Sequence, residues 1–113
     1  MTVKRNPLNL NPLQLKTLTL LQALAVLPDA KPGEAEGSVL LTTLPDPHGD
    51  HFHLGDAVVA SRDATGLGNP AVWAALQRKG LVRSLGKGGA ALTASGLGYP
   101  TGLRAAILRK PAD

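Results

Sequence analysis

Two stretches of the chain place apolar residues at helical spacing, and each begins with an asparagine followed by a proline. In the first stretch, Asn11 is a suitable N-cap and Pro12 takes the first helical position, where its missing N–H costs nothing. Pro28 ends the pattern, because proline cannot continue a helix. The apolar positions are Leu13, Leu15, Leu18, Leu20, Leu21, Leu24 and Leu27. This spacing predicts a helix over residues 12–27, with apolar side chains on more than one side.

In the second stretch, Asn69 and Pro70 repeat the same start, and Gly80 marks the end. The apolar face of this helix consists of Val72, Trp73 and Leu76. Residues 81–85 then alternate as in a strand, and residues 90–93 supply a returning strand. The run between them, Gly86-Lys87-Gly88-Gly89, suits a hairpin turn, because glycine accepts positive φ without strain. The sequence therefore predicts a short helix followed by a β-hairpin.

The segment between the two helices has weaker patterns. Residues 29–38 have the composition of a loop. Residues 39–44 form a short apolar run that fits either a strand or a helical turn. A strong turn signal, PDPHGD, leads into residues 51–54, which alternate as in a strand. We expect residues 39–44 and 51–54 to pair as a hairpin.

Residues 56–64 allow two interpretations. Asp56 suits the N-cap of a short helix, whereas the pair Val58 and Val59 suits a strand. Three further elements are expected beyond this segment: a turn at Gly66 and Gly68, a loop over residues 94–100 and a terminal helix over residues 103–109.

Length and composition limit the class of protein. A chain of 113 residues fits one domain, and 43% apolar against 18% charged residues argues against global disorder. Aromatic residues make up only 3%, so the core is expected to be aliphatic. We expect a flexible arm over residues 1–10 and a single domain over residues 11–110. Without cysteine the chain has no disulfide and no thiolate metal ligand.

The sequence also bears on the location of the protein. No apolar run approaches the ~18 residues of a membrane-spanning helix. The leucine-rich stretch after Lys4 and Arg5 is interrupted by Lys16, which argues against an export signal. We therefore expect a cytoplasmic protein that does not bind membranes.

Charge is unevenly divided along the chain. Residues 1–60 carry four basic and six acidic side chains, whereas residues 61–113 carry eight basic and two acidic side chains. A strongly basic half is typical of proteins with a polyanionic partner such as nucleic acid.

The string NPAVWAALQRKGLVRSLGKGGAALTASG, residues 69–96, resembles the recognition helix and wing of bacterial winged-helix regulators. The resemblance is to the multiple-antibiotic-resistance, phenolic-acid and arsenic-responsive repressor families. In these families a leucine and three mostly charged residues precede Gly-Leu-Val, and a basic strand returns through Leu-Thr and a nearby glycine. The matching residues here are Leu76, Gln77-Arg78-Lys79, Gly80-Leu81-Val82, Arg83, Lys87, Leu92-Thr93 and Gly96.

The resemblance implies an α+β winged helix-turn-helix fold, a helical core with a C-terminal β-hairpin wing. It implies a small transcriptional regulator that binds duplex DNA. The residues expected at the DNA are Asn69 at the helix start, Arg78 and Lys79 near its end, and Arg83 and Lys87 on the wing. A regulator of this kind is expected to be a homodimer, formed through the leucine-rich first helix or the C-terminal helix.

The sequence departs from the family at the helix surface. If Val72, Trp73 and Leu76 face the core, the positions that would face DNA are three alanines and one arginine. Those positions are Ala71, Ala74, Ala75 and Arg78. Base edges are read mainly by Arg, Lys, Asn and Gln, so this face offers little for sequence readout. The second hypothesis is therefore a protein-interaction module that keeps the winged-helix scaffold without sequence-specific DNA binding.

All three histidines lie in one polar cluster, which supplies a third hypothesis. His51 and His53 are two residues apart, so on a strand they share one face. Together with His48 or a neighbouring aspartate they form a possible zinc, nickel or iron site. No serine lies in a G-x-S-x-G elbow, and Gly86-Lys87-Gly88-Gly89 lacks the P-loop spacing. We expect no enzymatic activity and no cofactor.

Overall fold

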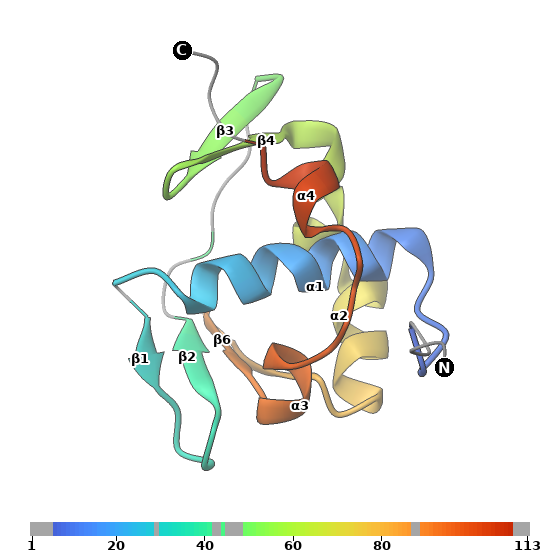
Figure 1. Ribbon diagram of the computed structural model, residues 1–113. Coiled ribbons are helices and arrows are strands. Elements are labelled where there is room, and N and C mark those ends of the chain that lie inside the picture. Colours follow the sequence, from blue (N-terminus) through green and yellow to red (C-terminus); the bar gives the residue numbers. More distant parts are fainter. Residues whose placement is uncertain (1–5, 29, 42–43, 45–48, 87–88, 110–113) are drawn as a thin grey trace, which may run out of the picture.

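The long helix α1 (Pro12–Ala25) crosses the middle of the molecule, and the two sheets and the other helices lie around it (Figure 1). The computed structural model describes all residues except 1–5, 29, 42–43, 45–48, 87–88 and 110–113. The chain forms a mixed α+β fold with two antiparallel sheets. Within the described residues, no helix combines the length and apolarity needed to cross a membrane.

Helix α1 begins as the sequence predicts and ends two residues early. The Asn11 side chain accepts a hydrogen bond from the Gln14 backbone N–H (2.8 Å), and the Gln14 side chain accepts one from the Asn11 N–H (3.0 Å). This reciprocal pair is a capping box, which satisfies two backbone donors at the helix start. Both sides of the helix are covered, since Leu18 and Leu21 lie in the main core and Leu20 lies in a second apolar cluster.

Removing this cap gives a testable expectation. Asn11→Ala leaves the Gln14 N–H without its side-chain acceptor and should lower the free energy of unfolding by about 1 kcal/mol. Urea denaturation measures the change. Asn11→Asp keeps an accepting oxygen and should stay close to the parent protein. Equal losses in the two variants would contradict the capping role.

The larger sheet contains four strands in the order β1-β2-β6-β5, and every neighbouring pair is antiparallel. The predicted β-hairpin after the second helix is confirmed. The strands are β1 (Lys31–Pro32), β2 (Val39–Leu41), β5 (Val82–Gly86) and β6 (Gly89–Leu92). The short strand β1 lies in the segment predicted as a loop.

The predicted pairing of residues 39–44 with 51–54 is wrong. Strand β2 pairs with β6 instead, with Val39 opposite Leu92 and Leu41 opposite Ala90. Leu41, Ala90 and Leu92 are all buried. Pairing with β6 therefore puts Leu41 into the main core, a gain that local sequence patterns do not reveal.

The second sheet is a separate hairpin of β3 (His51–Leu54) and β4 (Ala57–Ala60). Its two-residue turn consists of Gly55 and Asp56, and Gly55 has a φ of +60°. A positive φ at the first central position is the requirement of a type II′ turn, which suits hairpins. Asp56 therefore lies in a turn and does not cap a helix, and the strand interpretation of Val58 and Val59 is the correct one.

The 3₁₀ helix η1 (Ser61–Gly68) replaces the turn predicted at Gly66 and Gly68, and it leads directly into α2 (Pro70–Arg78). Lys16 of α1 forms an ion pair with Asp63 of η1 at 2.9 Å. A side chain at Gly66 would collide with Thr17, so this glycine permits the close contact of η1 with α1.

Two short helices follow β6 within the described residues. Helix α3 (Ala94–Leu97) lies in the segment predicted as a loop, and its start is capped by the Thr93 hydroxyl. Helix α4 (Arg104–Ile107) confirms the predicted terminal helix over a shorter range.

The expected arm is described only from residue 6, and there it contacts the rest of the fold. Leu10 lies in the main core with 4% of its surface exposed. The Tyr99 hydroxyl donates to the Asn6 side chain (2.7 Å) and accepts from the Leu8 N–H (2.9 Å). These contacts hold residues 6–10 against the segment after α3.

Candidate nucleic-acid interface

Helix α2 is fixed on the body by its apolar side and its caps. Val72 and Leu76 are buried in the main core, and Leu76 has no exposed surface. Trp73 is half-buried, and its indole N–H donates to the Leu67 carbonyl oxygen at 2.9 Å. This bond ties the first turns of α2 to the end of η1.

Of the residues expected to face DNA, Asn69 has a structural role. Its side-chain oxygen accepts from the Ala71 N–H at 3.0 Å, so it caps α2. A side-chain oxygen used in this way satisfies one of the free donors of the helix start, which holds the Asn69 side chain at the cap.

The outward surface of α2 carries small residues, Gln77 and one arginine. Ala71, Ala74 and Arg78 are exposed, as the sequence predicts. Ala75, which was expected on the same face, is buried with 4% exposed surface. The difference arises because the helix packs against both α1 and β5, which covers a wider stripe than the three predicted apolar residues.

The basic residues at the helix end and the wing have different environments. The Lys79 ammonium donates to the Leu8 carbonyl oxygen at 2.9 Å, so it anchors the N-terminal segment. Arg78 and Arg83 are exposed, and neither forms an ion pair with any residue in the part of the chain that the structure describes. Lys87 lies outside the described residues.

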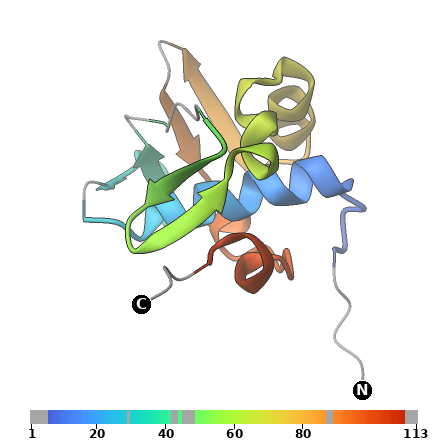
Figure 2. The ribbon, with the colours of Figure 1, turned by 90° about the horizontal axis from the view of Figure 1, so that it is seen from above.

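Figure 2 shows the β5–β6 hairpin and α2 side by side on one side of the molecule, with α4 on the opposite side. Helix α2 contacts β5 directly. Arg78, at the last turn of α2, and Arg83, in β5, therefore lie on neighbouring elements of the same body. This pair is called the α2–β5 basic surface below.

A shallow hollow of about 390 Å³ adjoins the outward face of α2. Its lining residues are Leu67, Gly68, Pro70, Trp73, Ala74 and Gln77. The hollow joins the exposed alanine face to the half-buried Trp73 ring, so this face combines small side chains with an apolar depression.

The histidine cluster is only partly described, because His48 lies outside the described residues. His51 and His53 are exposed on one face of β3, and their ring centroids are 5.8 Å apart. The His51 Nδ1 contacts a carboxylate oxygen of Asp50 at 2.8 Å, and this hydrogen bond lowers the pKa of Asp50. No group of three or more metal-ligating side chains occurs among the described residues. The metal hypothesis stays a prediction.

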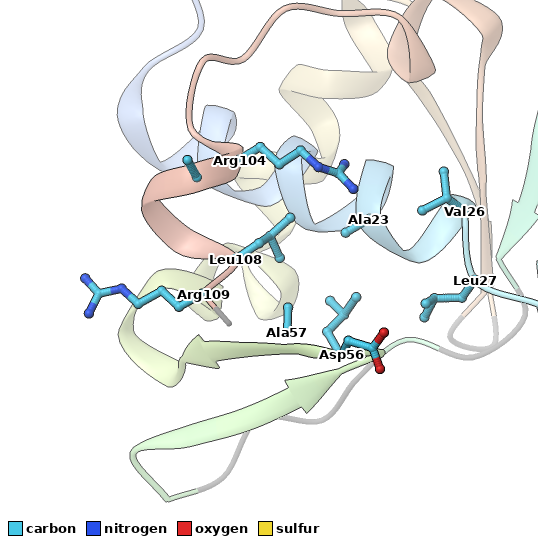
Figure 3. A pocket seen from close by; sticks show the side chains of 10 residues that line it. Ala23, Val26, Leu27, Asp56, Ala57, Arg104, Leu108 and Arg109 are labelled. Carbon is cyan, nitrogen blue, oxygen red and sulfur yellow. The ribbon is translucent and has the colours of Figure 1, made fainter. Parts of the chain in front are cut away.

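The structure also contains a groove that sequence analysis did not predict. It lies between the end of α1, the β3–β4 hairpin and α4 (Figure 3), and its volume is about 900 Å³. The residues that line it are Ala23, Val26, Leu27, Leu54, Asp56, Ala57, Arg104, Ala105, Leu108 and Arg109. They come from three separate parts of the chain, so no local motif marks the groove.

Comparison of this chain with protein-family models, with curated proteins and with solved structures gives no match.

Proposed function

We propose that the protein is a winged-helix protein that binds duplex DNA through α2 and the β5–β6 hairpin. The observation that carries this proposal is the arrangement of the back half of the chain. A helical pair, η1 and α2, is followed directly by an antiparallel hairpin that packs beside α2. This order agrees with the helix-plus-wing arrangement implied by the resemblance of residues 69–96.

The α2–β5 basic surface supplies the charge that the proposal needs. Arg78 and Arg83 are exposed on neighbouring elements, and neither forms an ion pair within the described residues. Exposed arginines without a carboxylate partner suit phosphate contacts, which provide most of the affinity in nonspecific DNA binding.

The chemistry of the outward helix face sets the expected specificity. Ala71 and Ala74 permit close approach to a groove of the duplex but offer no hydrogen bond to a base edge. Asn69 is used as a cap, and Lys79 donates to the Leu8 carbonyl oxygen. We therefore expect binding that depends strongly on salt and weakly on sequence, as for a protein that contacts mainly the DNA backbone.

Charge reversal at the basic surface tests the proposal. Arg78→Glu and Arg83→Glu should each weaken the binding of a mixed-sequence duplex, measured by fluorescence anisotropy across a range of salt concentrations. The slope of log affinity against log salt should shrink by about one for each phosphate contact removed.

The matched control is Arg104→Glu, since Arg104 is equally charged and exposed but lies on α4, on the opposite side of the molecule. It should leave both affinity and slope close to those of the parent protein. Equal losses in all three variants would indicate a general charge effect and contradict the proposed interface.

A protein-interaction module is the second candidate function, and the hollow beside α2 favours it. Small exposed alanines next to an apolar depression and a half-buried tryptophan suit a protein partner better than a phosphate backbone. The absence of any DNA response at low salt, together with retained folding, would favour this candidate over the first. Homodimer formation is a prediction, and sedimentation velocity tests it by measuring the oligomeric state.

A further inference from the structure

The groove between α1, the β3–β4 hairpin and α4 has the size and lining of a small-molecule site. Its volume of about 900 Å³ falls within the range of about 300–1,000 Å³ usual for ligand pockets. Seven of its ten lining residues are alanine, valine or leucine. Among them, Val26 has 65% of its surface exposed, so apolar surface is open to a ligand at this end of the groove.

Charged groups lie at the edges of this apolar lining. In Figure 3 the Arg104 side chain extends along the groove toward Ala23, whereas Asp56 lies on the opposite wall. No ion pair joins Arg104 to any carboxylate in the described parts of the chain. Arg109 points away from the groove in the same view, and its Nε donates to the Ala106 carbonyl oxygen at 3.4 Å. Arg104 is therefore the cation that faces a ligand in the groove.

We propose that this groove binds a small amphiphile with an aliphatic body and one anionic group, the anion lying at Arg104. The apolar lining would cover the aliphatic body, and the guanidinium would pair with a carboxylate. Asp56 on the opposite wall would repel the anionic group. The ligand would therefore bind in one orientation, with its anionic group at Arg104. This proposal does not depend on DNA binding.

A second copy of the chain fits the groove less well. Stable protein interfaces use about 20–30 residues on each side, so the ten described residues of this groove would form only part of such an interface. Arg104 is the one arginine that extends along the apolar lining, which matches a monovalent amphiphile, and Asp56 is the one acidic residue among the described lining residues.

Titration with decanoate tests the proposal, with decanol as the neutral comparator and decylamine as the cationic one. Amide NMR shifts report binding, and we expect decanoate to shift residues of α1, β4 and α4 that line the groove. Arg104→Gln should weaken decanoate binding by about fivefold, the upper range for an exposed ion pair, and leave decanol binding unchanged. Arg62→Gln, an exposed arginine outside the groove, is the matched control and should change neither.

Filling the groove provides an independent variant. Ala105 is exposed on α4, so Ala105→Trp should fold and should abolish binding of both decanoate and decanol. If this variant does not fold, Val26→Glu places a repelling charge at an exposed apolar position of the groove and should weaken decanoate binding selectively.

Three outcomes would overturn the proposal: no shifts with decanoate, equal decanoate affinity in Arg104→Gln and the parent, or tighter binding of decylamine than of decanoate. Sedimentation velocity tests whether the groove is instead covered by a second copy of the chain. Self-association that is lost in Ala105→Trp would show that a second copy covers the groove and would also overturn the proposal.

Discussion

Leu76→Ala should destabilise the protein by about 3 kcal/mol, because it empties a completely buried position in the main core. The Leu76 side chain has no exposed surface and shares this core with Leu18, Leu21 and Leu92. The surrounding side chains come from α1 and from the sheet, so they can only partly close the cavity. The total stability of a domain this size is about 5–15 kcal/mol, so the loss is a large share of it.

Urea denaturation measures this loss as a lower midpoint with an unchanged slope. The control is Leu97→Ala, since Leu97 is 36% exposed on α3 and its truncation leaves no sealed cavity. Leu97→Ala should lower the free energy of unfolding by less than about 1 kcal/mol, which is close to the effect usual for surface substitutions. A similar midpoint for the two variants would contradict the position assigned to α2.

The second large effect is expected at Gly96 in α3. An added Cβ would overlap the Leu81 carbonyl oxygen and would lie 2.7 Å from Leu92 Cδ1. The Leu81 carbonyl cannot move freely, because it accepts hydrogen bonds from the Thr93 N–H (3.1 Å) and the Thr93 hydroxyl (3.0 Å). Gly96→Ala should therefore cost about 3 kcal/mol, the upper range for overpacking.

Gly98→Ala is the matched control, two residues along the chain. A Cβ there meets only the Ala94 carbonyl oxygen, at an ordinary 3.6 Å. Its effect on the unfolding midpoint should be small. Thermal unfolding followed by circular dichroism compares the two variants, and an equal midpoint in both would show that α3 does not approach β6 and Leu81 as closely as described.

The elements with strong local signals were predictable from the sequence. Both long helices begin at an asparagine cap and a proline, and these signals lie within a few residues of the helix they start. The β5–β6 hairpin was predictable for the same reason, since its alternation and glycines are local. Local chemistry also predicted that Asn69 would act as a cap.

Elements that depend on distant partners were not predictable in this way. Strand β2 is short, and its pairing with β6 is decided by burial of Leu41 among residues distant in the sequence. The role of Lys79 likewise depends on the Leu8 carbonyl, 71 residues away in sequence. The groove was not predictable for the same reason, because three separate parts of the chain form its walls.

At the candidate interface, the exposure of the basic residues was easier to predict from the sequence than the exposure of the helix face. Arg78 and Arg83 are exposed as expected, whereas Ala75 is buried on a helix that packs against both α1 and β5. The sequence could not show this, because the width of the buried stripe depends on how many elements surround the helix.

The proposed DNA binding is tested most directly by amide NMR of the labelled protein titrated with mixed-sequence duplex DNA, at low and then at moderate salt. We expect shift changes centred on α2, β5 and β6 that weaken as salt is raised. No response at low salt, or a response centred on α4 and the groove, would contradict the proposed interface.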